Sequence, residues 1–190
     1  MLPTAVARKP LHHRHVHYAG FEREDGLFDI EASLLDTKTE AFEIDGEGPR
    51  QAGEPIHGMH LRVVIDAQFV VQDIEVAMAQ VPHGECLSAQ APMRRMVGCC
   101  MRQGWRQAIS ERLGKVQGCA HLRELLLNMG TVAIQTLSPR MGQARRQDGG
   151  VPLPMGGCLA WDPAGPMVAR IYPQFHIDAP APRLRPDGPG

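Results

Sequence analysis

Apolar and polar residues alternate strictly from residue 27 to residue 34, and this is the clearest pattern in the chain. Apolar side chains fall at positions 28, 30, 32 and 34, and charged or hydroxyl side chains fall between them. A period of two predicts a β-strand with one buried face. A second short strand is expected at residues 41–44, and the glycines and prolines of residues 45–55 predict a loop.

A β-hairpin is predicted over residues 61–78. Its first strand is mostly apolar and β-branched, residues 66–68 suit a tight turn, and apolar and acidic residues alternate in its second strand. His57 precedes the first strand and Cys86 follows the second. If the two strands pair antiparallel, His57 and Cys86 come to the same end of the hairpin.

Two helices are predicted in the second half of the chain. Apolar residues recur at steps of three and four over residues 93–113 and again over residues 122–136. Gly114 supplies an end to the first helix. Cys119 then lies where the second helix begins.

The predicted organisation is a single α+β domain over residues 18–177, with an antiparallel sheet and helices packed on one face. Residues 1–17 are expected to form a flexible N-terminal segment, and the Pro-rich residues 178–190 a disordered tail. Within the domain, residues 138–154 predict a linker, and residues 158–172 predict a closing hairpin around an Asp-Pro-Ala-Gly turn.

Composition narrows the classes of protein. The chain has 190 residues, 43% hydrophobic and 22% charged, which suits one domain with a real core. Its formal net charge of -1 gives no global reason to expect nucleic acid or an anionic membrane as a partner. No apolar run approaches the length of a membrane span or a signal peptide, so a cytoplasmic location is expected. The phosphate-binding and hydrolase motifs are absent, which disfavours nucleotide binding.

His57, Cys86 and Cys119 form the constellation that points to chemistry, since they would place one imidazole and two thiolates around one ion. The five cysteines are an odd number and a poor disulfide framework, so reduced thiols or metal ligands fit better. A helix N-terminus would stabilise the thiolate of Cys119. His121 is the nearest further candidate, as a fourth ligand or a proton carrier, with Glu124 able to orient it. Zinc and iron–sulfur clusters take these ligands.

Other histidines and cysteines have plainer interpretations. His60 is expected to point to the opposite face from His57. Cys99 and Cys100 fall within the first predicted helix, where packing is the default, and Cys158 stays open. The N-terminal histidines, at positions 12, 13, 15 and 17, are interpreted as part of a solvated tail.

Several strings resemble a bacterial family of proteins of unknown function, family 2889. These strings are residues 20–29, Asp36-Thr37-Lys38, Ile56-His57-Gly58-Met59, Gly118-Cys119-Ala120-His121-Leu122 and Cys158-Leu159-Ala160. The resemblance covers most of residues 12–175, with Ala120 in place of the family's usual threonine. It implies no established activity.

Residues 57–135 also resemble, in the order of their elements, the IscU- and NifU-type iron–sulfur cluster scaffolds. The resemblance implies an IscU/NifU-like core with the first ligand at or next to His57, the second at Cys86 and the last at Cys119. Two departures stand out, because His57 replaces a thiol and Gly118 replaces a frequent histidine. Both weaken the expectation of a labile cluster that is assembled and released, and they leave open a tighter zinc or iron site.

Two classes of function follow from these residues. The first is a metal- or cluster-binding scaffold or carrier, with His57, Cys86, Cys119 and His121 as ligands and a protein partner for metal or sulfur transfer. The second is an enzyme or sulfur-transfer protein that uses Cys119 as its nucleophile and His57 or His121 as the base. A third, purely structural interpretation places the cysteines in the core.

Overall fold

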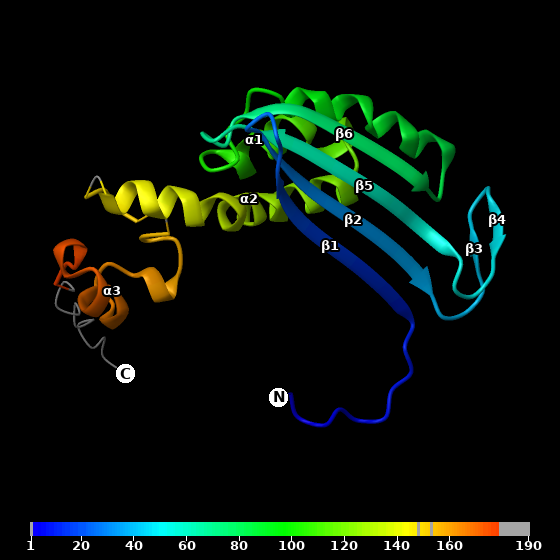
Figure 1. Ribbon diagram of the computed structural model, residues 1–190. Helices are drawn as coiled ribbons and strands as arrows, with labels where there is room; N and C mark the ends of the chain where they lie inside the picture. Colours follow the sequence, from blue (N-terminus) through cyan, green and yellow to red (C-terminus); the bar gives the residue numbers. More distant parts are fainter. Residues whose placement is uncertain (1, 148, 153, 179–190) are drawn as a thin grey trace, which may run out of the picture. The chain divides into compact units, whose positions relative to one another are not determined.

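The computed structural model describes residues 2–147, 149–152 and 154–178, and its main element is a four-stranded antiparallel sheet (Figure 1). Its strand order is β1-β2-β5-β6. The strands are β1 (His12–Glu22), β2 (Phe28–Lys38), β5 (Pro55–Ile65) and β6 (Val71–Gln80). The α+β class and the antiparallel sheet are therefore confirmed.

The predicted strands and turns of the first half are mostly confirmed. β2 carries the strict alternation, and β5 and β6 form the predicted hairpin. Because Gly58 pairs with Gln80, the start of β5 and the end of β6 meet at one end of that hairpin, as predicted. The predicted loop at 45–55 holds one more element, since β3 (Phe42–Ile44) pairs with β4 (Gly48–Arg50).

The first strand begins earlier than the sequence pattern suggests. β1 pairs with β2 over its whole length, from His12 opposite Lys38 to Glu22 opposite Phe28. The expected boundary between a flexible segment 1–17 and an ordered domain therefore falls inside β1. Local pattern missed this strand because its residues are polar and largely exposed, and the pairing comes from backbone hydrogen bonds to β2.

One face of the sheet forms the core, and the other face is open. The inner residues of β2 are buried, and the helices α1 and α2 lie on this side of the sheet in Figure 1. Strand β1 packs closely against α2 at Gly20, where an added Cβ would lie 1.9 Å from Thr136 Oγ1. The outer face carries exposed histidines and charged residues, including His60, which points away from His57 as predicted.

The helix predicted over residues 93–113 is wrong in its first half. The segment contains the short 3₁₀ helices η1 (Gly84–Ala89) and η2 (Ala91–Met96), and the α-helix α1 begins only at Trp105 and ends at Leu113. Between η2 and α1, Cys100 forms an isolated antiparallel β-bridge with Val70, and Cys99 O accepts a hydrogen bond from Val71 N. Two glycines with positive φ, Gly98 and Gly104, end the helical geometry on either side of this stretch.

The second predicted helix is α2 (Ala120–Gln147), which continues past its expected end at residue 136. The expected linker at 138–154 is therefore wrong for its first ten residues, where α2 includes Pro139. Straight-chain residues with high helix propensity follow that proline and favour the helix. No helix within the described residues is long and apolar enough to cross a bilayer.

The chain divides into two compact units, residues 1–137 and 138–190, and this division falls inside the predicted domain 18–177. In the second unit the predicted hairpin at 158–172 is wrong, because η4 (Leu159–Trp161) and α3 (Pro166–Ile171) occupy it. The turn between them is confirmed by the bond from Gly165 N to Asp162 O, 2.8 Å long. The predicted tail lies outside the described residues except for its first residue.

Candidate functional site

Asp36 is the centre of the candidate site. It occupies the fifth inward position of β2, after the apolar residues at 28, 30, 32 and 34, and only 2% of its surface is exposed. Among the described residues it is the single charged side chain that is buried. Burying a carboxylate is unfavourable unless it is paired and hydrogen-bonded, so its partners define the site.

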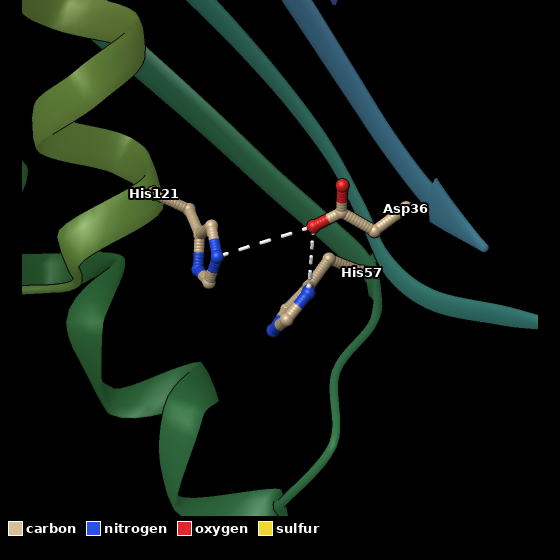
Figure 2. A group of neighbouring side chains, drawn as sticks. All are labelled: Asp36, His57 and His121. Atoms are coloured by element: carbon tan, nitrogen blue, oxygen red, sulfur yellow. Dashed lines mark hydrogen bonds and ion pairs between the residues drawn. The ribbon is translucent and has the colours of Figure 1, made fainter. Parts of the chain in front are cut away.

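Arg14 and His57 flank Asp36 in a row across three strands. Arg14 on β1 and His57 on β5 are the residues directly opposite Asp36 in the sheet. Arg14 donates from Nε to Oδ1 and from Nη2 to Oδ2, each at 2.8 Å. His57 Nδ1 lies 3.0 Å from Oδ2 (Figure 2). This row places charge and imidazole on the buried face of the sheet.

The acceptor positions of Asp36 are filled by these contacts. His12 Nε2 lies 3.2 Å from Oδ1, so each carboxylate oxygen has two hydrogen-bonding neighbours. A carboxylate offers about four lone-pair sites. Asp36 is therefore suited to anchoring Arg14 and His57 in fixed orientations.

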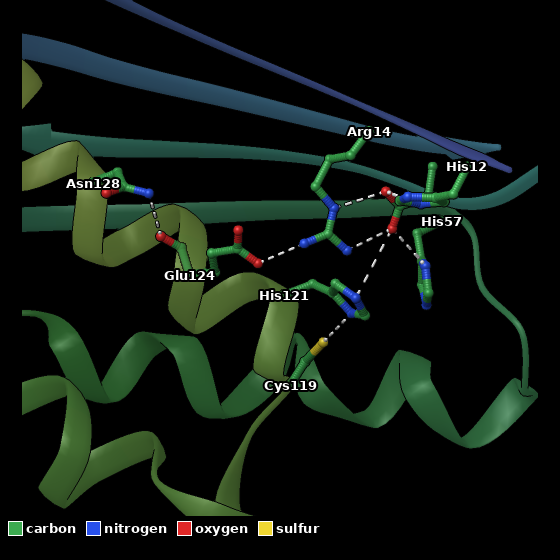
Figure 3. A network of polar contacts seen from close by, with 8 residues as sticks. His12, Arg14, His57, Cys119, His121, Glu124 and Asn128 are labelled. Atoms are coloured by element: carbon green, nitrogen blue, oxygen red, sulfur yellow. Dashed lines mark hydrogen bonds and ion pairs between the residues drawn. The ribbon is translucent and has the colours of Figure 1, made fainter. Parts of the chain in front are cut away.

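Helix α2 supplies the other side of the site through Cys119 and His121. Cys119 O accepts the bond from Arg123 N, 3.1 Å long, so Cys119 caps the helix. His121 Nδ1 lies 3.9 Å from Cys119 Sγ, and its Nε2 lies 3.9 Å from Asp36 Oδ2 (Figure 3). The ring centroids of His57 and His121 lie 4.0 Å apart, and the two ring planes are tilted by 40°.

Burial governs the protonation of both imidazoles. It lowers the pKa of His57, although the hydrogen bond to Asp36 acts in the opposite direction. It also lowers the pKa of His121, with the neighbouring His57 and Arg14 charges adding to the effect. Burial therefore favours the neutral form of both rings, which can offer a lone pair to a metal ion.

Asp36 itself is a firmly ionised group. Burial raises the pKa of this carboxyl, but the hydrogen bonds and positive charge of Arg14, with those of His57, outweigh burial and lower it to about 2. In return, the hydrogen bond to Asp36 raises the pKa of Arg14. The pair is therefore charged at neutral pH.

The metal-ligand atoms of the site are close together. One atom from each of Asp36, His57 and His121 lies within 4.8 Å of the other two. Imidazole and carboxylate are ligands for zinc and iron, with metal–ligand bonds of about 2.0–2.2 Å. Arg14 is hydrogen-bonded to the same carboxylate, so an ion that approaches Asp36 meets a positive charge there.

The structure brings two of the four predicted ligands into direct contact and places a third next to one of them. His57 and His121 are adjacent, and Cys119 lies beside His121. Cys86 is in η1, half-buried, and it lines a cavity of about 420 Å³ together with Cys119. Among the described residues, neither thiol belongs to the close donor group around Asp36.

The other cysteines lie elsewhere. Cys99 is buried and Cys100 half-buried in the stretch that pairs with β6 and the turn before it, rather than within a helix. Cys158 is exposed in the second unit.

Sequence reasoning missed Asp36, Arg14 and His12 as site residues. The signal for Asp36 was present, because it continues the period of two that runs from 28 to 34 and so lies on the buried face. A charged residue in a buried register position needs partners. Arg14 and His12 had no such signal, since the pairing of β1 with β2 determines their place.

Comparison with known proteins gives one match. Residues 12–135 match a family described as a protein of unknown function (DUF2889). No curated protein and no solved structure matches the chain, so the likeness to IscU- and NifU-type scaffolds stays a prediction. The matched segment includes all four strands of the main sheet, His57, Cys86 and the first half of α2 with Cys119 and His121. The chain therefore belongs to the DUF2889 family of proteins of unknown function.

Proposed function

We propose that this protein binds one zinc or iron ion between His57, His121 and Cys119, with Asp36 holding His57 in place. The observation that carries the proposal is the pair of adjacent imidazoles, with ring centroids 4.0 Å apart, beside a thiol and a buried carboxylate. His57 uses Nδ1 for Asp36, which leaves Nε2 for a metal. Carboxylate–histidine–metal arrangements of this kind fix the ring and raise its basicity.

Cys119 supports the proposal as the third donor. Its Sγ lies 3.9 Å from His121 Nδ1, a separation that two ligands of one ion can adopt, since metal–nitrogen and metal–sulfur bonds are about 2.0 and 2.3 Å. Three protein ligands leave a fourth position for Cys86, water or a transferred group.

A role as a metal or cluster carrier depends on whether Cys86 is the fourth ligand. Cys86 lines the same cavity as Cys119, and it would become a ligand if η1 moved toward Cys119. The resulting set, His57, Cys86, Cys119 and His121, is the one that the sequence predicts for a metal or iron–sulfur scaffold. A thiolate reached through an open cavity suits delivery of the metal or sulfur to a protein partner.

Metal and acid-labile sulfide analysis of anaerobically purified protein tests the proposal. We expect about one equivalent of metal, lost in His57→Gln, His121→Gln and Cys119→Ser and retained in the control Cys158→Ser. Loss of the metal in Cys86→Ser would identify Cys86 as the fourth ligand. Acid-labile sulfide together with visible absorption would identify an iron–sulfur cluster. Absence of metal from every sample after loading with zinc or iron would refute the proposal.

A second function is favoured by the order of three groups. Cys119 Sγ, the His121 ring and Asp36 Oδ2 lie in series, with 3.9 Å at each step. This order suits a cysteine nucleophile, a general base and a carboxylate that orients the base. Metal-free protein would then show alkylation of Cys119 that is fast at pH 7 and slowed about tenfold or more in His121→Gln. Alkylation at the rate of a free thiol would exclude this alternative.

A further inference from the structure

Charge is unevenly distributed within the first unit of the chain. Residues 91–123, which form η2, α1 and the beginning of α2, contain seven arginines and lysines and one glutamate. Residues 22–85, which hold most of the sheet, contain four basic and fifteen acidic residues. The near-neutral net charge of the chain conceals this separation.

Most of the arginines in the basic segment have structural partners. Arg95 and Arg112 each bond to the other's backbone carbonyl, and Arg123 Nη1 bonds to three carbonyls around residues 113–118. Arg94 Nη1 lies 3.7 Å from Asp73. Arg102 and Arg106 are different, since both are exposed and neither forms an ion pair with another described residue. Their charges are free to interact with a partner.

These two arginines border a groove between α1 and α2. The groove has a volume of about 670 Å³, and Leu127 and Ile134 of α2 line it with half-buried apolar side chains. Gly130 lies between them and allows the close packing of Trp105, because a Cβ at Gly130 would lie 3.0 Å from that ring. The result is an apolar floor whose charged lining residues are Arg102, Arg106 and Glu111, so positive charge exceeds negative charge by one.

We propose that this groove binds an acidic, amphipathic segment of a partner protein. Leucine-like side chains would cover Leu127 and Ile134, and carboxylates would pair with Arg102 and Arg106. Charge complementarity supports this occupant. Nucleic acid is disfavoured because the groove's aromatic residue, Trp105, is 7% exposed and its Nε1–H is bonded to Leu126 O, leaving no ring for base stacking. A bilayer is disfavoured because the apolar residues line a concave groove.

The proposal does not depend on a metal at the Asp36 site. It predicts binding by protein with or without metal, so failure of one proposal leaves the other standing. The partner is identified only by its chemistry, as a negatively charged helix with one apolar face.

Fluorescence anisotropy of a labelled synthetic peptide tests this inference with the full chain. The probe is a helix of about 18 residues, or five turns, with leucine on one face and glutamate on the other. We expect the affinity to fall at least about tenfold, or about 1.4 kcal/mol, in Arg102→Glu/Arg106→Glu, and to fall as salt is raised. Arg50→Glu, a charge reversal on β4, is the matched control and should leave the affinity unchanged.

Two further measurements distinguish the contribution of the groove's shape to peptide binding from that of its charge. Thr131→Trp would fill the groove without changing its charge, and it should also weaken the peptide by about tenfold or more. The same peptide with glutamine in place of glutamate should bind more weakly than the acidic one. The proposal would be overturned if the acidic peptide did not bind, or if Arg102→Glu/Arg106→Glu bound it as tightly as Arg50→Glu. It would also be overturned if oligothymidine or phosphatidylserine vesicles bound more tightly than the peptide. Circular dichroism of each variant establishes that it is folded.

Discussion

Arg14 donates two hydrogen bonds of 2.8 Å to Asp36, and this pair joins the edge strand β1 to the buried face of the sheet. The remaining nitrogen of the guanidinium donates to Glu124 of α2, also at 2.8 Å. One side chain therefore connects the edge strand, its neighbour and the helix that carries His121. Because Asp36 also contacts His57, the two imidazoles are positioned by the same pair.

Replacement of the buried carboxylate should destabilise the protein. Asp36→Asn removes the counter-charge of Arg14, and breaking a buried ion pair costs about 3–5 kcal/mol. We expect about 3 kcal/mol, the lower end, because Arg14 keeps Glu124. Urea unfolding measures the change. Glu40→Gln, which breaks the exposed pair with Lys9, is the control and should cost less than about 1 kcal/mol. Equal losses in both variants would contradict this role for Asp36.

Stability should fall as the pH is lowered below about 6.5. Burial lowers the pKa of His57 and of His121 from the ordinary value of 6.5, so the unfolded chain takes up these protons first and is favoured in acid. Urea unfolding at a series of pH values between about 8 and 5 measures the slope. The slope should diminish in His57→Gln/His121→Gln and persist in His13→Gln/His15→Gln, whose histidines are exposed. If the dependence of stability on pH were unchanged in His57→Gln/His121→Gln, other titratable groups would be its cause.

A second loss of stability is expected in stronger acid. The pKa of Asp36 is about 2 in the folded protein, below its ordinary value of 3.8, so its stabilisation is present above pH 3.8 and is lost as the pH falls toward 2. Asp36→Asn should remove this step from the unfolding profile. Persistence of the whole step in that variant would show that another carboxyl causes it.

Zinc should protect Cys119 from alkylation. A metal-bound thiolate is a poor nucleophile toward iodoacetamide, and its sulfur is covered by the ion. Peptide mass spectrometry of protein treated with and without zinc measures modification at each cysteine. Cys158 is exposed and lies in the other unit, so its modification should not respond to zinc. Protection of both cysteines, or of neither, would contradict the proposed ligand set.

The contact between β1 and α2 should tolerate no side chain at Gly20. A Cβ there would lie 1.9 Å from Thr136 Oγ1 and 2.9 Å from its Cβ. Gly20→Ala should therefore destabilise the protein by about 1–3 kcal/mol, as overpacking does. Thermal or urea unfolding of Gly20→Ala, Thr136→Ala and the double variant forms a cycle. The loss of unfolding free energy in the double variant should be smaller than the sum of the losses in the two single variants. Additive losses would mean that the two residues do not compete for space.

Elements with a strong local period were predictable, and elements formed by distant pairing were not. β2 and the β5–β6 hairpin follow from alternation and turn residues alone. The helical spacing of apolar side chains continues through residues 97–101, yet Gly98 N donates to Val71 O, Met101 N donates to Phe69 O, and Cys99 O accepts from Val71 N. The same spacing suits either arrangement, and the partner strand decides between them.

The candidate site was also predictable in part: its residues could be identified from the sequence, but their grouping could not. His57, Cys86, Cys119 and His121 were identified because they lie at the ends of predictable elements, where antiparallel pairing and a helix start gather side chains. Their exact grouping depended on how α2 packs, which brings His121 against His57 and leaves Cys86 in the neighbouring cavity.

The sequence by itself determined the family, the α+β class, the half-buried β2 and the chemistry-bearing residues at the element ends, because these depend on residue type and local spacing. Only the tertiary structure decided that β1 joins the sheet, that Arg14 and His12 meet Asp36, and that His121 rather than Cys86 faces His57. The physical reason is that a strand with polar side chains has no pattern of its own. Its register, and with it the neutralisation of a buried carboxylate, comes from backbone pairing between segments more than twenty residues apart.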